Sequence, residues 1–252
     1  MSQMISKRLE SIKAVIFDLG DTLYTLPYSV DDCHMRFLKE IFGDDFIVTY
    51  QELDRAQDAA EAAMTKLIEE SATGPDYALT TDEWILFDRI LLENLGVKDN
   101  IDENSRKYQQ LWDRLAKNQP NKLRPGAREV LEELNQRGFK MGVASNWDQS
   151  PHDLLSDSGV RHFFQCLQWT LVKGYAKPSP YMLIMNAHEL GVNPLRCAFV
   201  GNKENLDVEA ARKAGMLPVL LDNSAGSSVP LLDDTLIIDK LEDLLHHLPL
   251  TV

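Results

Sequence analysis

The sequence has few cysteines and no long apolar run. Its 252 residues include three cysteines, Cys33, Cys166 and Cys197, which lie far apart. An odd number of widely separated cysteines forms neither a disulfide framework nor a metal-ligand spacing, and is typical of a reducing compartment. No stretch approaches the roughly 18 apolar residues of a membrane-spanning helix. These absences exclude disulfide-stapled secreted proteins and helical membrane proteins.

The N-terminal segment does not have the pattern of a secretory signal. Residues 1–17 read MSQMISKRLESIKAVIF and carry four charged side chains. Their apolar run is too short for a signal sequence, and it leads directly into a strand-like segment. We therefore expect no cleaved signal and, together with the cysteine pattern, a cytoplasmic protein.

Basic residues are fewer than acidic ones. The sequence has 26 lysines and arginines against 39 aspartates and glutamates, which gives a formal net charge of −13. Most of the excess lies in residues 27–121, which hold 20 acidic and 10 basic residues. Because such a segment repels a polyanion, a nucleic-acid partner is not expected. A solvated, acidic helix surface is the simplest interpretation.

Residues 27–121 show helical patterns and almost no strand pattern. Thr49 with Glu52, and Thr80 with Glu83, have the spacing of capping boxes, and apolar residues follow each pair at three-to-four spacing. Four amphipathic helices in about 95 residues predict a small helical bundle. The predicted helices are 31–42, 49–71, 80–95 and 103–117.

The rest of the chain alternates strand and helix patterns. The run KAVIFD at 13–18 predicts a buried strand before the helical segment, and the alternation resumes after Pro125. This order predicts an α/β fold, a Rossmann-like parallel sheet with helices on both faces. The predicted core is discontinuous, formed by 1–26 and 122–252, with the helical segment 27–121 inserted. The later strands are expected at 140–145, 196–200, 217–221 and 235–238, and the helices at 126–137, 180–190 and 205–214.

Polar side chains follow the predicted strands, at the carboxyl ends where an open parallel sheet binds ligands. A carboxylate in such a place can attack phosphorus and form an aspartyl-phosphate. A lysine and a divalent cation can offset the negative charges. Side chains of these types, gathered at one edge of the sheet, could together carry out phosphoryl transfer. The candidate residues are Asp18, Ser145, Asn146, Lys177, Asn202 and Asp207.

Four segments, in order, resemble the motifs of the haloacid dehalogenase superfamily. They are VIFDLGDTLY, LRPGAREVLEELNQRGFKMGVASN, GYAKPSP and FVGNKENLDVEAARKAGM. The helical segment falls where many members carry a helical cap, between the first and second motifs. The resemblance implies a phosphatase-type hydrolase with a helical cap, and the acidic cap favours a small phosphorylated metabolite as substrate.

The resemblance also implies a role for each candidate. Asp18 corresponds to the nucleophile, and Lys177 would act in catalysis by tying the phosphoryl group to it. Ser145 and Asn146 would bind that group, and Thr22 would support the loop in the same phosphate-binding set. The implied ligands of a Mg²⁺ cofactor are Asp18, the backbone carbonyl of Gly20, Asn202 and Asp207.

Two positions depart from the family pattern. Family phosphatases place a second aspartate two residues after the nucleophile as general acid and base, and this chain has Gly20 there. Asp21 could take over the role of this second aspartate only if the loop were remodelled. In an extended segment, a residue one position further along points its side chain to the opposite face. Asn202 replaces an acidic metal ligand, so weak Mg²⁺ binding is expected. Lys203 beside it adds a positive charge.

Three functions therefore remain open. The first is a Mg²⁺-dependent phosphatase of a small phosphorylated metabolite. The second is a non-catalytic binding or regulatory protein, which Gly20 and Asn202 favour. The third is a metal-free 2-haloacid dehalogenase, in which the nucleophile attacks carbon, although the spacing from Gly201 to Asp207 is of the phosphatase type. The sequence leaves the substrate and the oligomeric state open.

Overall fold

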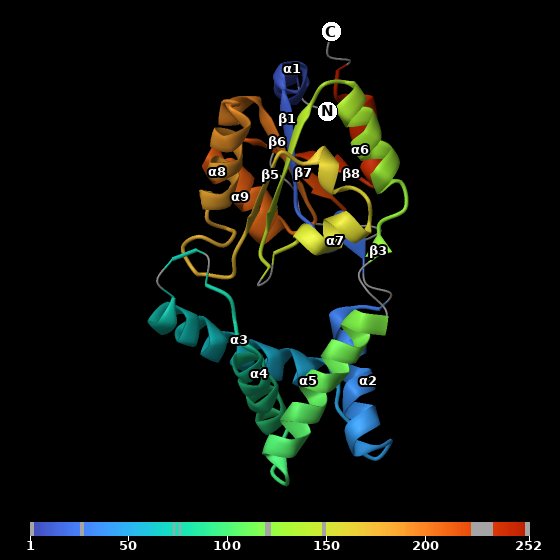
Figure 1. Ribbon diagram of the computed structural model, residues 1–252, viewed down its shortest axis with the longest axis vertical. Helices are drawn as coiled ribbons and strands as arrows, with labels where there is room; N and C mark the ends of the chain where they lie inside the picture. Colours follow the sequence, from blue (N-terminus) through green and yellow to red (C-terminus); the bar gives the residue numbers. More distant parts are fainter. Residues whose placement is uncertain are drawn as a thin grey trace. The chain divides into compact units, whose positions relative to one another are not determined.

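The chain folds into two compact units. We call Met1–Thr25 with Lys122–Val252 the sheet unit, and Leu26–Asn121 the helical unit (Figure 1). The boundaries predicted from the sequence, at residues 26–27 and at 121, lie outside the described residues. The computed structural model describes residues 3–25, 28–72, 74–75, 77–118, 122–147, 150–222 and 234–249.

The sheet unit is built on six strands in the order β5-β4-β1-β6-β7-β8. Every pair of neighbours is parallel, so all the carboxyl ends lie along one edge, where such sheets bind ligands. This arrangement confirms the predicted α/β fold and makes the ends of β4, β1 and β6 neighbours. The strands are β1 (Ala14–Phe17), β4 (Lys140–Ser145), β5 (Cys166–Trp169), β6 (Cys197–Gly201), β7 (Leu217–Leu221) and β8 (Leu236–Ile238).

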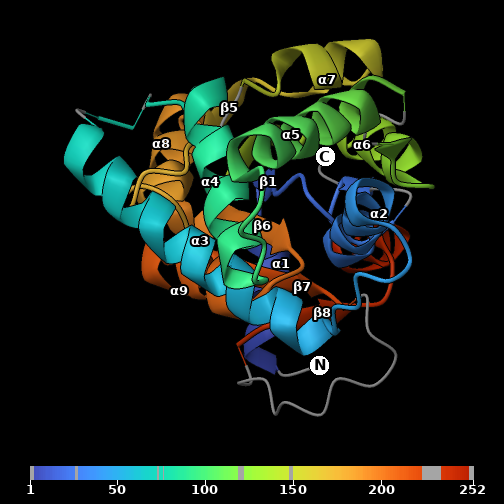
Figure 2. The ribbon, with the colours of Figure 1, turned by 90° about the horizontal axis from the view of Figure 1, so that it is seen from below.

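The side chains of β1 alternate between two hydrophobic cores. Val15 and Phe17 pack with helices α1, α6, α7 and α10, whereas Ala14 and Ile16 pack with α8 and α9. The alternation follows from the period of two in a strand. Figures 1 and 2 show α8 and α9 on one side of the sheet and α6 on the other. The helices are α1 (Gln3–Ser11), α6 (Ala127–Gln136), α7 (His152–Asp157), α8 (Tyr181–Leu190), α9 (Glu209–Ala214) and α10 (Leu244–His247).

Some elements are absent from the sequence prediction. Helix α1 is short, and its buried Ile5 and Leu9 span too few residues to show a clear period. Strand β5 lies at the sheet edge, where its half-buried residues give no apolar run. Strands β2 (Tyr24–Thr25) and β3 (Lys122–Leu123) pair antiparallel where the chain leaves and re-enters the sheet unit.

The helical unit contains four helices in its described residues, as predicted. Capping boxes are present at Thr49 and Thr80. Helix α4 packs against α3 and α5, and α2 packs against α5, around an apolar core. Every described helix of the chain is too short or too polar to cross a membrane. The helices are α2 (Val30–Phe42), α3 (Tyr50–Ser71), α4 (Thr81–Asn94) and α5 (Ile101–Asn118).

The core of the helical unit contains buried polar side chains. Nδ1 of His34 lies 2.7 Å from the Tyr108 hydroxyl, and burial lowers the pKa of His34 to about 4. Asp88 is 1% exposed, and its Oδ2 has no hydrogen-bond partner among the described residues. Burial, with a smaller effect from the charge of Asp113, raises the pKa of Asp88 to about 8. The Asp88 carboxyl is therefore mostly protonated at neutral pH.

Replacing Asp88 by asparagine tests this assignment. Asp88 of the unfolded chain ionises near pH 4, whereas in the folded protein it keeps its proton up to about pH 8. Because the folded state binds one more proton than the unfolded state in this range, the free energy of unfolding falls as the pH rises from about 4 to 8. Asparagine has a similar shape and does not ionise. We expect Asp88→Asn to raise the free energy of unfolding by up to about 5 kcal/mol near pH 8, at about 1.4 kcal/mol for each pH unit of this window, and to lose this gain near pH 4.

Urea unfolding at a series of pH values measures the difference between variant and wild type. Asp54→Asn, at an exposed position of α3, controls for the general effect of removing one negative charge. A gain for Asp88→Asn that is equal at pH 4 and pH 8 would contradict the buried, protonated carboxyl.

Candidate functional site

Asp18 lies at the carboxyl edge of the sheet, one residue after β1. Its backbone N–H donates to the carbonyl of Val200 at 2.9 Å, which extends the pairing of β1 with β6. Its side chain is buried, with the residue 6% exposed. Strand pairing on the central strand therefore fixes the backbone that carries the candidate nucleophile.

The loop after Asp18 turns back sharply. Asp21 has φ of +54°, a left-handed conformation that aspartate tolerates better than most residues. Arg124 donates to the carbonyls of Asp21 at 2.6 Å and Thr22 at 2.9 Å, which holds the turn closed. Gly20 and Asp21 are exposed, in contrast to Asp18, so a general-acid role for Asp21 stays a prediction.

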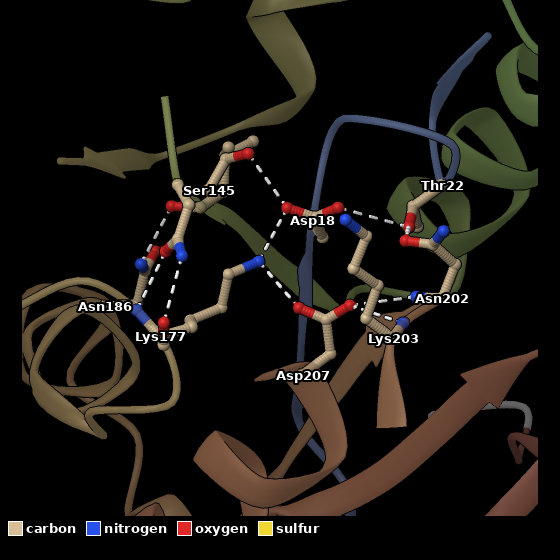
Figure 3. A network of polar contacts seen from close by, with 10 residues as sticks. Asp18, Thr22, Ser145, Lys177, Asn186, Asn202, Lys203 and Asp207 are labelled. Carbon is tan, nitrogen blue, oxygen red and sulfur yellow. Dashed lines mark hydrogen bonds and ion pairs between the residues drawn. The ribbon is translucent and has the colours of Figure 1, made fainter. Parts of the chain in front are cut away.

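Both oxygens of the Asp18 carboxylate accept hydrogen bonds (Figure 3). Ser145, the last residue of β4, donates from Oγ to Oδ1 at 2.8 Å, and the Lys177 ammonium donates to the same oxygen at 2.6 Å. The Thr22 hydroxyl donates to Oδ2 at 3.3 Å. Three candidates from separate segments therefore meet on one carboxylate.

Lys177 also binds the second carboxylate of the site. Its ammonium lies 2.7 Å from Oδ1 of Asp207 and 5.2 Å from the centre of the Phe199 ring. Oδ2 of Asp207 accepts from the backbone N–H groups of Asn202 at 3.0 Å and Lys203 at 2.9 Å. The hydrogen bonds and ion pairs among Lys177, Asp18 and Asp207 are shown in Figure 3, and they place Lys177 between two buried carboxylates.

The loop after β6 requires a glycine. A Cβ at Gly201 would collide with the side chain of Asp207, so the backbone there can approach Asp207 only without a side chain. Asp207 itself lies in a π-helical turn, Glu204–Val208, a rare conformation that is frequent at functional sites. The close approach brings Asp207 under the end of β6.

The buried ionic groups do not cancel. Asp18 and Asp207 carry two negative charges and Lys177 one positive charge, so the triad has a net charge of −1 when all three ionise. Burial alone would lower the pKa of Lys177, but the two carboxylates outweigh it and the pKa lies above its usual value. Burial raises the pKa of Asp207, and Lys177 opposes that rise. The site can therefore accept a further cation.

Two oxygen atoms suited to a hard cation, one from Asp18 and one from Asn202, lie on either side of the Thr22 hydroxyl. The Thr22 hydroxyl lies 3.3 Å from Oδ2 of Asp18 and 3.4 Å from the amide oxygen of Asn202, as Figure 3 shows. Mg²⁺ prefers such oxygen ligands. The described residues contain no group of three or more histidine, cysteine or acidic side chains that could by itself hold a metal ion. A cation here would therefore depend on amide and backbone oxygens beside the two carboxylates.

Asn146 reaches the site through the backbone of Lys177. Its Nδ2 donates to the Lys177 carbonyl at 3.0 Å, and its Oδ1 accepts from the Lys177 N–H at 2.8 Å. The phosphate-binding role expected for Asn146 stays a prediction.

Sequence reasoning missed two supporting residues. Arg124, which holds the Asp18 loop, stands beside Pro125 with no local sign of its partners. Asn186 of α8 is fully buried and donates to the carbonyls of Val143 at 2.9 Å and Met182 at 3.0 Å. A polar residue at mid-helix suggests a surface position, so its link between α8 and β4 was not visible in the sequence.

Comparisons with known proteins identify relatives that match most of the chain. A glyceraldehyde 3-phosphate phosphatase of Methanopyrus kandleri is 26% identical over 217 residues, covering 82% of this chain and 83% of the relative. A phosphoglycolate phosphatase of Salmonella choleraesuis is 27% identical and covers 94% of this chain and 93% of the relative. These relatives support a phosphatase-type hydrolase.

A solved structure and a family model complete the comparison. The crystal structure of a putative beta-phosphoglucomutase from Thermotoga maritima has a TM-score of 0.64 at 18% identity, and the match covers 93% of this chain and 97% of that one. This likeness shows the fold. The model of a family described as haloacid dehalogenase-like hydrolase matches residues 12–215, a range that includes every residue of the Asp18 network. The chain therefore belongs to the haloacid dehalogenase-like hydrolases.

Proposed function

We propose that this protein is a Mg²⁺-dependent phosphatase of a small phosphorylated metabolite, acting through an aspartyl-phosphate on Asp18. The observation that carries the proposal is the buried Asp18 carboxylate with Ser145 and Lys177 on one of its oxygens. The names of the two curated relatives suggest glyceraldehyde 3-phosphate and phosphoglycolate as the first substrates to try.

In the first step, an Asp18 oxygen attacks phosphorus. A bond forms between phosphorus and the carboxylate, and the bond from phosphorus to the leaving oxygen breaks, with its electron pair going to that oxygen. The Ser145 hydroxyl and the Lys177 ammonium already lie at Oδ1, so they can donate to the phosphoryl oxygens as these arrive. Donors held in place before the reaction need little reorganisation.

In the second step, water attacks the phosphorus of the aspartyl-phosphate. The acyl phosphate bond breaks, inorganic phosphate leaves and the Asp18 carboxylate is restored. In the first step the leaving oxygen either departs as an anion or takes a proton from solvent or a side-chain acid. In the second step the attacking water loses a proton to solvent or a side-chain base. Gly20 has no side chain for this transfer, so a leaving group that departs as a stable anion reacts best.

A Mg²⁺ ion would be held by oxygens of Asp18, Gly20, Asn202 and Asp207. When bound, it would offset the negative charge of the phosphoryl group and of Asp18. The oxygens of Asp18 and Asn202 both lie near the Thr22 hydroxyl, which supports this set, and the neutral amide of Asn202 supports weak binding. We also propose that the helical unit is the cap that selects the substrate.

Asp18→Asn tests the nucleophile. An amide cannot form the acyl phosphate, so we expect phosphate release to fall by at least about 10³-fold. The measurement is a phosphatase screen with and without Mg²⁺, including p-nitrophenyl phosphate and the two metabolites. Glu132→Gln, at an exposed position of α6, makes the same change of carboxylate to amide away from the site. Turnover that persists in Asp18→Asn would rule out the proposal, as would halide release from a 2-haloacid by the wild type.

Gly20→Asp tests the missing acid and base. Nothing lies within 4 Å of a Cβ built at Gly20, so the described structure has room for the side chain. Wild-type enzyme should hydrolyse p-nitrophenyl phosphate much faster than an alkyl phosphate. A carboxyl group at position 20 should raise alkyl phosphate turnover by up to roughly 10²- to 10⁴-fold.

Steady-state rates for p-nitrophenyl, phenyl and glycerol phosphates give this comparison. Gly20→Ala is the matched control because it adds the Cβ without the acid, and the steep dependence on the leaving group should remain. Equal wild-type rates for aryl and alkyl phosphates would show that another group supplies the proton.

Asn202→Asp tests the weakened metal site. A carboxylate in place of the amide adds a negative charge beside a triad of net charge −1, so we expect the Mg²⁺ concentration for half-maximal activity to fall about tenfold. Calorimetric titration with Mg²⁺ should show the same gain in affinity. Asn205→Asp adds the same charge at an exposed position nearby and should have a small effect. Unchanged Mg²⁺ affinity in Asn202→Asp would remove Asn202 from the ligand set.

A further inference from the structure

Asn146 makes two hydrogen bonds to one residue. Its side-chain amide donates to the carbonyl of Lys177 and accepts from the N–H of Lys177, at 3.0 and 2.8 Å. Because both backbone groups belong to Lys177, the amide fixes the peptide units on either side of the Lys177 Cα. Asn146 directly follows β4, so these bonds attach the Lys177 backbone to the sheet.

The loop that carries Lys177 has mostly local hydrogen bonds around that residue. The N–H groups of Tyr175 and Ala176 donate to the carbonyl of Val172 at 3.0 and 2.8 Å, and the N–H of Ser179 donates to Ala176 at 3.0 Å. These bonds shape turns within the loop and do not set its distance from the strands. The two bonds from Asn146 span 31 positions and do set that distance.

Lys177 needs such a support. A lysine side chain carries about 2 kcal/mol of rotamer entropy, yet its ammonium must lie within 2.7 Å of oxygens from Asp18 and Asp207. Since a displacement of about 1 Å can cost roughly 10²-fold in rate, the position of the Lys177 backbone matters for the whole contact.

We propose that Asn146 is a positioning residue for Lys177, whose backbone its amide holds so that the ammonium reaches Asp18 and Asp207. The effect on turnover rests on the phosphatase function proposed above, and the contact itself does not. Ser145 and Asn146 then serve the same carboxylate in different ways. Ser145 donates to Asp18 directly, and Asn146 acts through Lys177.

A double-mutant cycle on kcat/KM tests the connection. If Asn146 acts through Lys177, Asn146→Ala should lower kcat/KM for p-nitrophenyl phosphate about 10- to 100-fold in the wild-type background. In a Lys177→Met background, the same substitution should cost less than about threefold. A purely structural residue would cost the same factor in both backgrounds, and that result would overturn the proposal.

Labelling of Lys177 tests the contact without using turnover. Trace acetylation with acetic anhydride, followed by peptide mass spectrometry, gives the rate for each lysine, with the exposed Lys98 as internal reference. Asn146→Ala should raise the rate at Lys177 about tenfold, because the freed ammonium leaves its buried carboxylates. Asn146→Asp has nearly the same size and keeps the acceptor, but it loses the donor and places a negative charge beside the Lys177 carbonyl. It should also raise the rate at Lys177, and it serves as the second variant if the alanine variant folds poorly.

Asn186→Ala is the matched control. Asn186 also donates to two backbone carbonyls in the sheet unit, and neither belongs to Lys177. It should lower the stability and leave Lys177 labelling near the wild-type rate. An equal rise in Asn186→Ala, or none in either Asn146 variant, would overturn the proposal. A wild-type enzyme that hydrolyses no phosphate ester would instead refute the phosphatase function, and the labelling would still decide the role of Asn146.

Discussion

The site depends on the ammonium of Lys177 between the carboxylates of Asp18 and Asp207. All three side chains are buried, and two carboxylates left alone in such surroundings would repel each other and lose hydration. Removing one partner from a buried ion pair typically costs about 3–5 kcal/mol. The lysine therefore stabilises the fold at the same carboxylate that we propose as the nucleophile.

The sheet order makes this meeting possible. Three of the site residues come from the ends of neighbouring strands: Asp18 follows β1, Ser145 ends β4 and Asp207 follows β6. Because these strand ends are neighbours, the three side chains lie close together. Close contact also requires small residues. A Cβ at Gly142 would strike the amide of Asn186, and one at Gly201 would strike Asp207. Glycine at these positions lets a helix and a loop approach the strands that carry the site.

The parallel sheet and most of its site residues follow from local sequence patterns. Asp18 ends an apolar run, and Ser145 and Asn202 stand at the ends of later ones, so strand-end chemistry predicted where they lie. The residues that hold the site in place could not be predicted from local sequence patterns, because their hydrogen-bond partners are remote in the sequence. Arg124 binds Thr22 across 102 positions, and Asn146 binds Lys177 across 31. The hydrophobic periodicity of the sequence carries no information on such contacts, because they form only between segments that the folded sheet brings together.

Gly20 and Asn202, the two positions that differ from the family pattern, have different consequences for the charge of the site. When all three groups ionise, the triad has a net charge of −1, and a phosphate dianion would bring it to −3, so a cation that entered with the substrate would offset repulsion. An acidic residue at 202 would attract Mg²⁺ more strongly and also repel the phosphate more strongly. In the proposed mechanism the neutral amide would weaken both interactions, and lower repulsion of the substrate would offset part of the lost metal affinity. Glycine at position 20 would have no such compensation in the proposed mechanism, because charge cannot replace a proton donor. Unless Asp21 supplies the proton, Gly20 would therefore restrict the chemistry more than Asn202 does.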